Sequence, residues 1–247
     1  MMLGGKTAVV TGANRGIGKA IVDTFLRHGA QVFACIRTLA PETPSEWTEL
    51  ARAHRGAIHT VQLDLASEDS IKAAARGIQQ AAPRIDVLVN NAGIATGGLF
   101  QMTSIAEMRK VFEVNLFAPL LFTQFIVRAM ARHKCGSIIN ISSTSALIPD
   151  PGTLAYGSSK AAFSRATLSL AGELGALNIR VNAIAPGVTR TDMFEQMAVA
   201  ARDSLIQRSA LKRAGEAQDV ANAALFLAAD LSAHITGQII RVDGGIA

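Results

Sequence analysis

The amino-acid sequence predicts a doubly wound α/β fold, in which a parallel seven-stranded sheet carries helices on both faces. Short runs rich in β-branched residues alternate with longer segments of helical period along the 247 residues. The runs are apolar almost throughout, as expected of strands that are covered on both sides. Because no linker rich in Pro, Ser or Gly and no internal repeat divides the chain, we predict a single domain, 1–247.

The predicted elements alternate from one end of the chain to the other. Strand-like runs lie at 7–10, 31–36, 58–63, 85–89, 137–141, 179–184 and 238–242. Helical patterns lie at 17–28, 45–54, 67–80, 104–132, 154–177 and 216–229. Two segments do not follow this order. Residues 38–44 contain two prolines and indicate a loop, and 188–213 mixes short helical patches with polar residues after a Pro-Gly pair.

The segment 188–213 is predicted to be a substrate lid. Ligands of open α/β sheets bind outside the carboxyl ends of the strands. An irregular insertion that follows a strand is well placed to cover such a site.

Composition excludes several classes of protein. With 49% hydrophobic and 17% charged residues, the chain can bury a core and is neither disordered nor fibrous. The two cysteines, Cys35 and Cys135, form no Cys-x-x-Cys pair, which argues against a disulfide scaffold and a zinc site. The N-terminus lacks a signal-peptide core, and apolar stretches such as 116–122 are too short to span a bilayer. We therefore expect a cytoplasmic protein without a membrane partner or a metal.

The net charge of +5 is spread along the chain. Aromatic residues do not interleave with the Lys and Arg residues, so no nucleic-acid partner is expected. A basic surface of this kind also suits an anionic carrier protein or a phosphorylated substrate.

A glycine-rich turn follows the first predicted strand, in the run Thr11-Gly-Ala-Asn-Arg-Gly-Ile-Gly18. Glycines there permit a tight turn, and the N–H groups at the start of the following helix can face an anion. An ordinary strand-to-helix turn is the alternative, but the position directly after the first strand favours a dinucleotide site. Its predicted members are Gly12, Asn14, Arg15, Gly16, Ile17 and Gly18.

The end of the second predicted strand indicates which dinucleotide binds. NAD enzymes usually carry Asp or Glu there, whereas this chain reads Cys35-Ile36-Arg37-Thr38. A guanidinium at Arg37 suits a 2′-phosphate, and Arg15 lies close enough along the turn to assist. We predict NADP(H); the alternative is that both arginines are only exposed surface charges.

The chain has one tyrosine, Tyr156, among 10 Phe. Lys160 follows it by one helical turn, so both side chains project from the same face of the predicted helix 154–177. An adjacent cation favours the phenolate and is expected to lower the pKa of the phenol from about 10, which suits a group that exchanges protons with a substrate. The alternative is a core aromatic residue.

Several polar residues stand where strands end. Asn90-Asn91-Ala92-Gly93 follows one predicted strand, and Ser142 and Ser143 follow another. Neighbouring residues of a strand face opposite ways, so only one serine can point into a site. Asn115 lies inside a helical pattern that Asn disfavours, and so marks either a function or a bend in the helix.

Taken together, these residues resemble the short-chain dehydrogenase/reductase family, which implies a Rossmann fold. The matched features are the glycine turn, Asp64, Asn90-Asn91-Ala92-Gly93, Asn115, Ser143, Tyr156-x-x-x-Lys160, Pro186-Gly187 with Thr191, and Val242-Asp243-Gly244-Gly245. The resemblance implies that Tyr156 is the general acid in reduction, Ser143 binds the carbonyl oxygen, Lys160 binds the nicotinamide ribose and Asn115 holds a relay water. It also places at the cofactor Asp64, Leu65, Asn91, Ala92, Gly93, Tyr156, Lys160, Pro186, Gly187 and Thr191.

Two of these positions have simpler alternatives. Asp64 either bonds the adenine, as the resemblance implies, or caps the helix that begins near Ser67. Pro186-Gly187 either lies beside the nicotinamide or is only a turn.

Within the family, the turn Asn14-Arg15 and the run 178–182 are most similar to 3-oxoacyl-acyl-carrier-protein reductases of fatty acid biosynthesis. This resemblance implies reduction of a 3-oxoacyl thioester, an acyl carrier protein docked near Arg128, Arg132, His133 and Lys134, and a homotetramer with 116–122 and 161–163 at its interfaces or in the monomer core. Leu177 and the segment 94–99 depart from that pattern. A reductase of another ketone, sugar or polyol therefore stays open, as does a non-catalytic dinucleotide-binding regulator.

Overall fold

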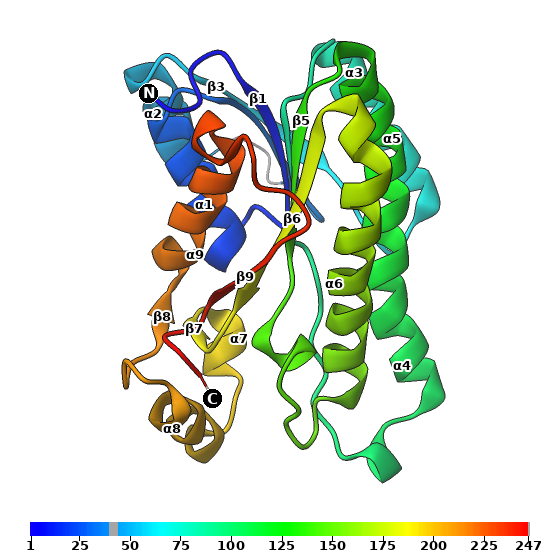
Figure 1. Cartoon of the computed structure of the whole chain (residues 1–247), viewed down its shortest axis with the longest axis vertical. Helices are drawn as coiled ribbons and strands as arrows, with labels where there is room; N and C mark the ends of the chain where they lie inside the picture. The colour runs from blue at the N-terminus through cyan, green and yellow to red at the C-terminus, as the bar shows by residue number, and fades with distance from the viewer. Residues whose placement is uncertain (40–43, 247) are drawn as a thin grey trace.

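A seven-stranded parallel sheet crosses the centre of the molecule, as the computed structural model of residues 1–39 and 44–246 shows (Figure 1). Its order is β3-β2-β1-β4-β5-β6-β9, which reverses direction between β1 and β4. This arrangement confirms the predicted doubly wound fold. The strands are β1 (Thr7–Thr11), β2 (Gln31–Ile36), β3 (Ala57–Gln62), β4 (Val87–Asn90), β5 (Gly136–Ile141), β6 (Ile179–Pro186) and β9 (Ile239–Val242).

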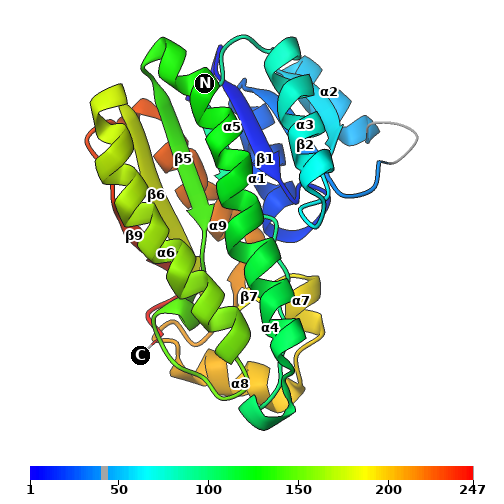
Figure 2. The same cartoon turned by 90° about the vertical axis from the view of Figure 1, so that its right-hand side faces the viewer.

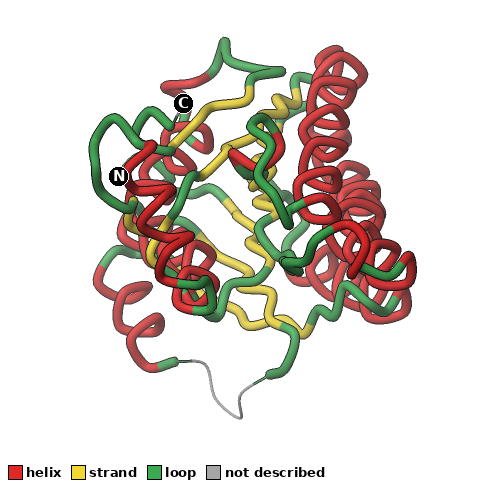
Figure 3. Tube along the Cα trace, turned by 90° about the horizontal axis from the view of Figure 1, so that it is seen from below, coloured by secondary structure: helices red, strands yellow, loops and turns green. Residues whose placement is uncertain are grey.

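Helices cover both faces of the sheet, and Figure 3 shows the strands between the two helical layers. One layer holds α1 (Gly16–Arg27), α2 (Ser45–Ala53) and α9 (Ala217–Ala228), and the other holds α3 (Glu68–Ala81), α5 (Ala118–His133) and α6 (Leu154–Leu174). Successive strand residues face opposite layers: Val10 and Val89 pack with the α1 layer, Val9 and Leu88 with the α3 layer. Burial of each such side chain stabilises the fold by about 1.5–3 kcal/mol.

The predicted helix 104–132 is interrupted at its middle. It divides into α4 (Ile105–Phe112), a π-helical turn (Glu113–Phe117) and α5. Pro119 explains the break, because it has no N–H to donate to the carbonyl of Asn115 and its ring crowds that carbonyl in a regular helix. The prediction of one regular helix was therefore wrong at the turn that carries Asn115.

The helical stretch Ile105–His133 is long and apolar enough to cross a bilayer by length and composition alone, with a mean hydropathy of 1.5 in its most apolar window. Half of that window is buried inside the protein. Buried residues such as Phe122 and Ile126 pack in the core beside α3. Packing within the fold therefore accounts for the buried half of this apolar stretch.

The predicted lid segment 188–213 leaves the sheet and forms structure of its own. It contains β7 (Thr189–Arg190), α7 (Asp192–Glu195) and α8 (Val199–Arg208), and β7 pairs in parallel with β8 (Gly215–Glu216) just beyond it. Figure 2 shows α7 and α8 beyond the end of the sheet. Of the predicted loop 38–44, residues 40–43 lie outside the described residues.

Candidate active site

The predicted site residues lie at one edge of the sheet. Gly12 follows β1, Asn91 follows β4, Ser142 follows β5 and Gly187 follows β6. All four strands are parallel neighbours, so their carboxyl ends meet at this edge. The reversal of strand order between β1 and β4 falls in the same place, where open α/β sheets bind ligands.

The glycine turn is a cradle without room for side chains. Gly12 and Gly16 have φ values of +64° and +53°, which favour glycine. A Cβ at Gly18 would lie 2.1 Å from the Gly12 carbonyl oxygen. Helix α1 begins here with no acidic residue in its first turn and no side chain capping it, so its N–H groups are open to an anion. The backbone of this turn therefore fits the pyrophosphate of a dinucleotide.

Thr11 and Asn91 lock this turn to the end of β4. The Thr11 hydroxyl accepts hydrogen bonds from the N–H groups of Asn91 and Ala92, each at 3.0 Å. Asn91 Nδ2 in turn donates to the carbonyls of Thr11 (3.0 Å) and Gly12 (3.1 Å). Thr11 was not among the predicted site residues. The one signal for it in the sequence was its position directly before the first glycine of the turn.

The two arginines predicted to select the cofactor are both exposed. Arg37 directly follows β2, and the carbonyl of Cys35 accepts a hydrogen bond from Ala13 of the glycine turn (3.1 Å). Arg15 is paired with Asp192 of α7, at 2.8 Å. The guanidinium of Arg15 therefore links the glycine turn to the segment 188–213.

The side chains of Ser143, which follows β5, and Tyr156, in the first turn of α6, contact each other. The Ser143 hydroxyl is hydrogen bonded to the Tyr156 phenol. Ser142 instead turns toward the interior, where its hydroxyl lies 2.6 Å from that of Ser164. Of the two serines, Ser143 is therefore the one whose hydroxyl lies at the Tyr156 phenol.

Lys160 lies one helical turn after Tyr156 in α6, and its side chain is buried, at 4% exposure. Its ammonium donates to the Ile141 carbonyl at the end of β5 (2.8 Å). Burial lowers the Lys160 pKa to about 8. A Cβ at Gly93 would lie 3.4 Å from Lys160 Nζ, so the ammonium lies beside the end of the Asn90-Asn91-Ala92-Gly93 run.

The expected lowering of the Tyr156 pKa by Lys160 is not what the structure shows. Burial raises the Tyr156 pKa, and the hydrogen bond with Ser143 only partly opposes this shift. The Lys160 ammonium is directed to the Ile141 carbonyl instead of the phenol. At neutral pH the phenol is therefore held in its protonated form.

Asn115 anchors the loop that follows Gly93. Its side chain accepts from the Ile94 N–H (2.8 Å) and donates to the Ile94 carbonyl (2.9 Å). Nδ2 also donates to Ser159 (3.1 Å), whose hydroxyl donates to the Tyr156 carbonyl (2.7 Å). Asn115 lies in the π-helical turn, so the predicted bend of the helix is present at this residue. Its role in a proton relay stays a prediction. Ser159 is a further residue that sequence reasoning missed.

Two further predicted cofactor residues, Asp64 and Leu65, lie shortly after β3 and are fixed by different contacts. Asp64 accepts from the Ala66 N–H (2.9 Å), while Ser67 caps α3 by accepting from Ser70 (3.2 Å), so the alternative that Asp64 is the helix cap is wrong. Leu65 is buried in the core beside α3.

Pro186 and Gly187 close the end of β6. Pro186 is the last residue of the strand, and a Cβ at Gly187 would lie 2.7 Å from the Cβ of Asp243. Thr191 reaches the glycine turn, since a Cβ at Gly16 would lie 3.2 Å from its methyl group.

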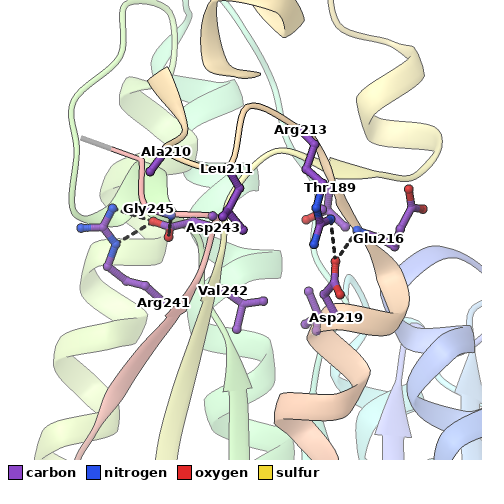
Figure 4. Close-up of a pocket in the computed structure, with 13 residues that line it drawn as sticks. Thr189, Ala210, Leu211, Arg213, Glu216, Asp219, Arg241, Val242, Asp243 and Gly245 are labelled. Carbon is purple, nitrogen blue, oxygen red and sulfur yellow. Dashed lines mark hydrogen bonds and ion pairs between the residues drawn. The ribbon is translucent and has the colours of Figure 1, made fainter. Parts of the chain in front are cut away.

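The segment 188–213 is tied to the loop before Tyr156. Arg208 of α8 forms an ion pair with Asp150 at 2.5 Å. A cavity of about 560 Å³ lies at the base of this segment, between β8 and the residues that follow β9 (Figure 4). Its charged lining residues are largely paired with one another, as in Arg213 with Asp219 and Arg241 with Asp243. The cavity contains none of the predicted catalytic residues.

The described ranges, 1–39 and 44–246, hold no group of three or more His, Cys, Asp or Glu residues that could bind a metal ion.

Comparisons with known proteins agree with this geometry. A family model described as enoyl-(acyl carrier protein) reductase matches residues 12–247. The chain is 38% identical over 246 residues to the 3-oxoacyl-acyl-carrier-protein reductase FabG of Thermotoga maritima, covering 100% of this chain and 99% of that protein. It is also 38% identical over 246 residues to a 3alpha-hydroxysteroid dehydrogenase of Mediterraneibacter gnavus, covering 99% and 98% of the two chains.

A solved structure of a mutant short-chain dehydrogenase/reductase from Serratia marcescens is similar along the whole chain. It aligns with a TM-score of 0.91 at 30% identity and covers 100% of this chain and 99% of that one. The matches confirm the resemblance predicted from the motifs. The chain therefore belongs to the short-chain dehydrogenase/reductase family and is an oxidoreductase that acts on CH–OH or C=O groups with a nicotinamide dinucleotide.

Proposed function

We propose that this protein uses NADPH to reduce a carbonyl group to an alcohol, with a 3-oxoacyl thioester as the substrate class. The observation that carries the reaction is the hydrogen-bonded Ser143–Tyr156 pair, with a buried Lys160 one helical turn after the tyrosine, at the edge of the sheet where the glycine turn lies. Relatives named 3-oxoacyl-acyl-carrier-protein reductase support the thioester. A hydroxysteroid dehydrogenase of equal identity keeps another ketone as the second candidate.

The chain's own residues supply the proton and the binding of the substrate oxygen. Tyr156, which burial keeps protonated, donates its proton to the oxygen that becomes the alcohol. Ser143 holds the same oxygen by a hydrogen bond, a type of contact worth about 3 kcal/mol in other enzymes. The Lys160 ammonium stabilises the phenolate left behind. The bound nicotinamide supplies the hydride.

Lys160, held at the end of β5, is also the residue that would bind the ribose of the cofactor. Asn115 acts by positioning, because both N–H groups of its side-chain amide donate to Ile94 and Ser159 and its Oδ1 accepts from the Ile94 N–H. A water relay from Lys160 past Asn115 remains part of the proposal. It would involve the Asn115 backbone, since Pro119 cannot donate to that carbonyl.

The preference for NADPH rests on Arg37 and Arg15. Arg37 stands exposed after β2 with no carboxylate at the usual NAD position, and Arg15 lies in the turn. Arg37→Asp should lower the ratio of kcat/KM with NADPH to kcat/KM with NADH by about tenfold or more. Arg27→Asp, the same charge change at the far end of α1, is the control. An unchanged ratio in Arg37→Asp contradicts the assignment.

Carrier-protein docking needs a separate test. The basic residues Arg128, Arg132, His133 and Lys134 end α5 just before β5 begins, so within one chain they lie at the edge of the sheet opposite Ser143. A carrier bound to them would not face the cleft of the same chain. Reduction of acetoacetyl-CoA and of an acetoacetyl carrier protein should therefore be compared in the wild type and in Arg132→Glu.

A homotetramer and a cytoplasmic location complete the proposal. Phe117 is 55% exposed at the end of the π-helical turn, as a residue of an interface would be in the isolated chain. Sedimentation equilibrium would give the assembly directly. Cys35 and Cys135 are both free thiols, which supports a reducing compartment.

The substrate class is tested by NADPH oxidation with acetoacetyl thioesters, steroid ketones, sugars and small ketones. We expect kcat/KM for the thioester to exceed that of every other class by more than about tenfold. Rates within tenfold across the classes would defeat the thioester assignment while leaving the carbonyl reductase in place.

A further inference from the structure

Three consecutive residues at the end of β5 contact the part of α6 that carries Tyr156 and Lys160. The Ile141 carbonyl accepts a hydrogen bond from the Lys160 ammonium, at 2.8 Å. The hydroxyl of the next residue, Ser142, donates to the backbone carbonyl of Lys160, at 3.3 Å. The Ser143 hydroxyl is hydrogen bonded to the Tyr156 phenol. The end of β5 therefore holds the ammonium of Lys160, its backbone and the phenol at once.

Ser142, the middle residue of the three, is itself fixed to the sheet. It is 2% exposed, and its N–H donates to the Ile184 carbonyl of β6 at 2.7 Å. Its hydroxyl lies 2.6 Å from that of Ser164, which is also buried. Because a hydroxyl has one hydrogen, both contacts are made when Ser164 donates to Ser142 and Ser142 donates to the Lys160 carbonyl. A rigid point of the sheet is thus joined to the helical turn 160–164.

A second polar contact joins β5 to α6 farther along the helix. Asn140 lies two residues before Ser142, so both side chains project from the same face of the strand. Asn140 Nδ2 donates to the Thr167 hydroxyl at 2.9 Å, and Thr167 is fully buried. Thr167 lies about two helical turns after Lys160. The helix is therefore attached to β5 by polar contacts at two points along its length.

The buried face of α6 offers little apolar packing that could fix its position instead. Its buried residues are Ala155, Gly157, Ser159, Lys160, Phe163, Ser164, Thr167 and Ala171. Among these, Phe163 is the one large apolar side chain. Close interlocking of side chains is what gives a packed element a single position, and small side chains interlock weakly. Buried polar contacts can fix the register of such an element.

We propose that Ser142 is a positioning residue for the reduction: its hydroxyl sets where α6 lies along β5, and so brings the Tyr156 phenol to Ser143 and the Lys160 ammonium to the end of the strand. The inference rests on the proposed function. A displacement of about 1 Å at a reacting group can cost about a hundredfold in rate. The Ser142 hydroxyl therefore affects the reaction through Tyr156 and Lys160, although it is turned into the interior.

The test compares Ser142→Ala with Ser137→Ala. Ser137 lies on the same strand, is 3% exposed, and its hydroxyl donates to the Leu227 carbonyl at 2.8 Å. Each variant thus loses one buried hydroxyl that donates to a backbone carbonyl, but Ser137 lies at the end of β5 far from Ser143. Reduction of acetoacetyl-CoA by NADPH gives kcat/KM. Ultraviolet titration of the phenol with NADP⁺ bound gives the Tyr156 pKa, and urea unfolding establishes that both variants are folded.

We expect Ser142→Ala to lower kcat/KM by about tenfold or more. The pKa of Tyr156 in the NADP⁺ complex should rise by about 0.5 or more, because the Ser143 hydrogen bond and the Lys160 ammonium both favour the phenolate and both depend on the position of α6. Ser137→Ala should stay within about twofold of the wild-type rate, with the wild-type pKa, because α6 keeps its contacts with the end of β5.

Two results would overturn the inference. One is a Ser142→Ala protein that matches Ser137→Ala in both rate and pKa. The other is a change in rate or in the Tyr156 pKa without the other, since a shift of α6 must move both. If the pKa rises as expected but the wild type reduces no carbonyl substrate, the proposed function fails and the positioning role of Ser142 stands.

Discussion

The buried surroundings of Lys160 disfavour the charged form of its side chain. Its side chain is buried, its ammonium bonds the Ile141 carbonyl, and burial lowers its pKa to about 8. In the unfolded chain the same group has a pKa of about 10.4. The folded protein therefore holds Lys160 at a cost in stability, which the proposed role beside Tyr156 explains.

Replacement of Lys160 by Met should separate stability from activity. Carbonyl reduction should fall by more than about a hundredfold, because no cation is left to stabilise the Tyr156 phenolate. The free energy of unfolding at pH 7 should not fall and should rise by up to about 2 kcal/mol, since a buried charge is replaced by an apolar chain of similar length. Urea denaturation measures this difference.

The pH dependence of that difference has a definite sign. Between about pH 8 and about pH 10.4 the unfolded wild type binds a proton at Lys160 that the folded protein has lost, so wild-type stability rises with pH in this window. The advantage of Lys160→Met should be largest below pH 8 and shrink toward pH 10. A loss of more than about 1 kcal/mol in Lys160→Met at pH 7 would show that the ammonium stabilises the fold.

Residues whose chemistry is visible in the sequence were the ones that could be predicted. The spacing of Tyr156 and Lys160 and the order of the glycines are local patterns, and the structure brings these groups to one edge. Thr11 and Ser159 were missed because each acts through a residue far away in the sequence. Thr11 is hydrogen bonded to Asn91, and Ser159 is hydrogen bonded to Asn115. Such contacts depend on tertiary structure, and no local pattern reports them.

At the scale of elements, the π-helical turn shows a signal present in the sequence but not used. Pro119 stands four residues after Asn115, where a regular helix would need its N–H. The spacing of the apolar residues alone predicted a continuous helix over 104–132, because the apolar face continues through the π-helical turn. The proline marks the place where the regular α-helical hydrogen bonds are interrupted.

The glycine turn is predicted to fail when a single methyl group is added. Gly18→Ala would place a Cβ 2.1 Å from the Gly12 carbonyl oxygen, which forces the turn open. The Kd for NADPH, followed by cofactor fluorescence, should rise about tenfold or more. Gly77→Ala on α3 is the control: its Cβ meets nothing within 4 Å, and it should raise stability by about 0.5–1 kcal/mol without changing the Kd. Equal Kd values for the two variants would remove the steric argument.

The segment 188–213 should loosen when its tie to Asp150 is removed. Asp150→Asn deletes the charge that pairs with Arg208, at a partly buried site. KM for the carbonyl substrate should rise about threefold or more, and limited proteolysis within 188–213 should become faster. Asp230→Asn, which breaks an exposed pair with Lys6, is the matched control. If Asp150→Asn is cut no faster than Asp230→Asn, the ion pair does not hold the segment.

At the scale of the whole molecule, periodicity was enough to predict the sheet. Each of its seven strands overlaps a predicted run, since strands buried on both faces must be apolar along their length. The paired strands β7 and β8 were missed because each has two residues, too few for any pattern. The lid role of the segment 188–213 stays a prediction.

The lone tyrosine offers the most direct test of the central claim, that Tyr156 exchanges a proton with the substrate beside a bound nicotinamide. With one tyrosine in 247 residues, phenolate absorbance in the ultraviolet reports on Tyr156 alone. We predict a pKa above the usual value of about 10 in the free protein, where burial dominates, and a pKa clearly below it when NADP⁺ is bound. A pKa that stays at or above 10 in the complex would contradict the account.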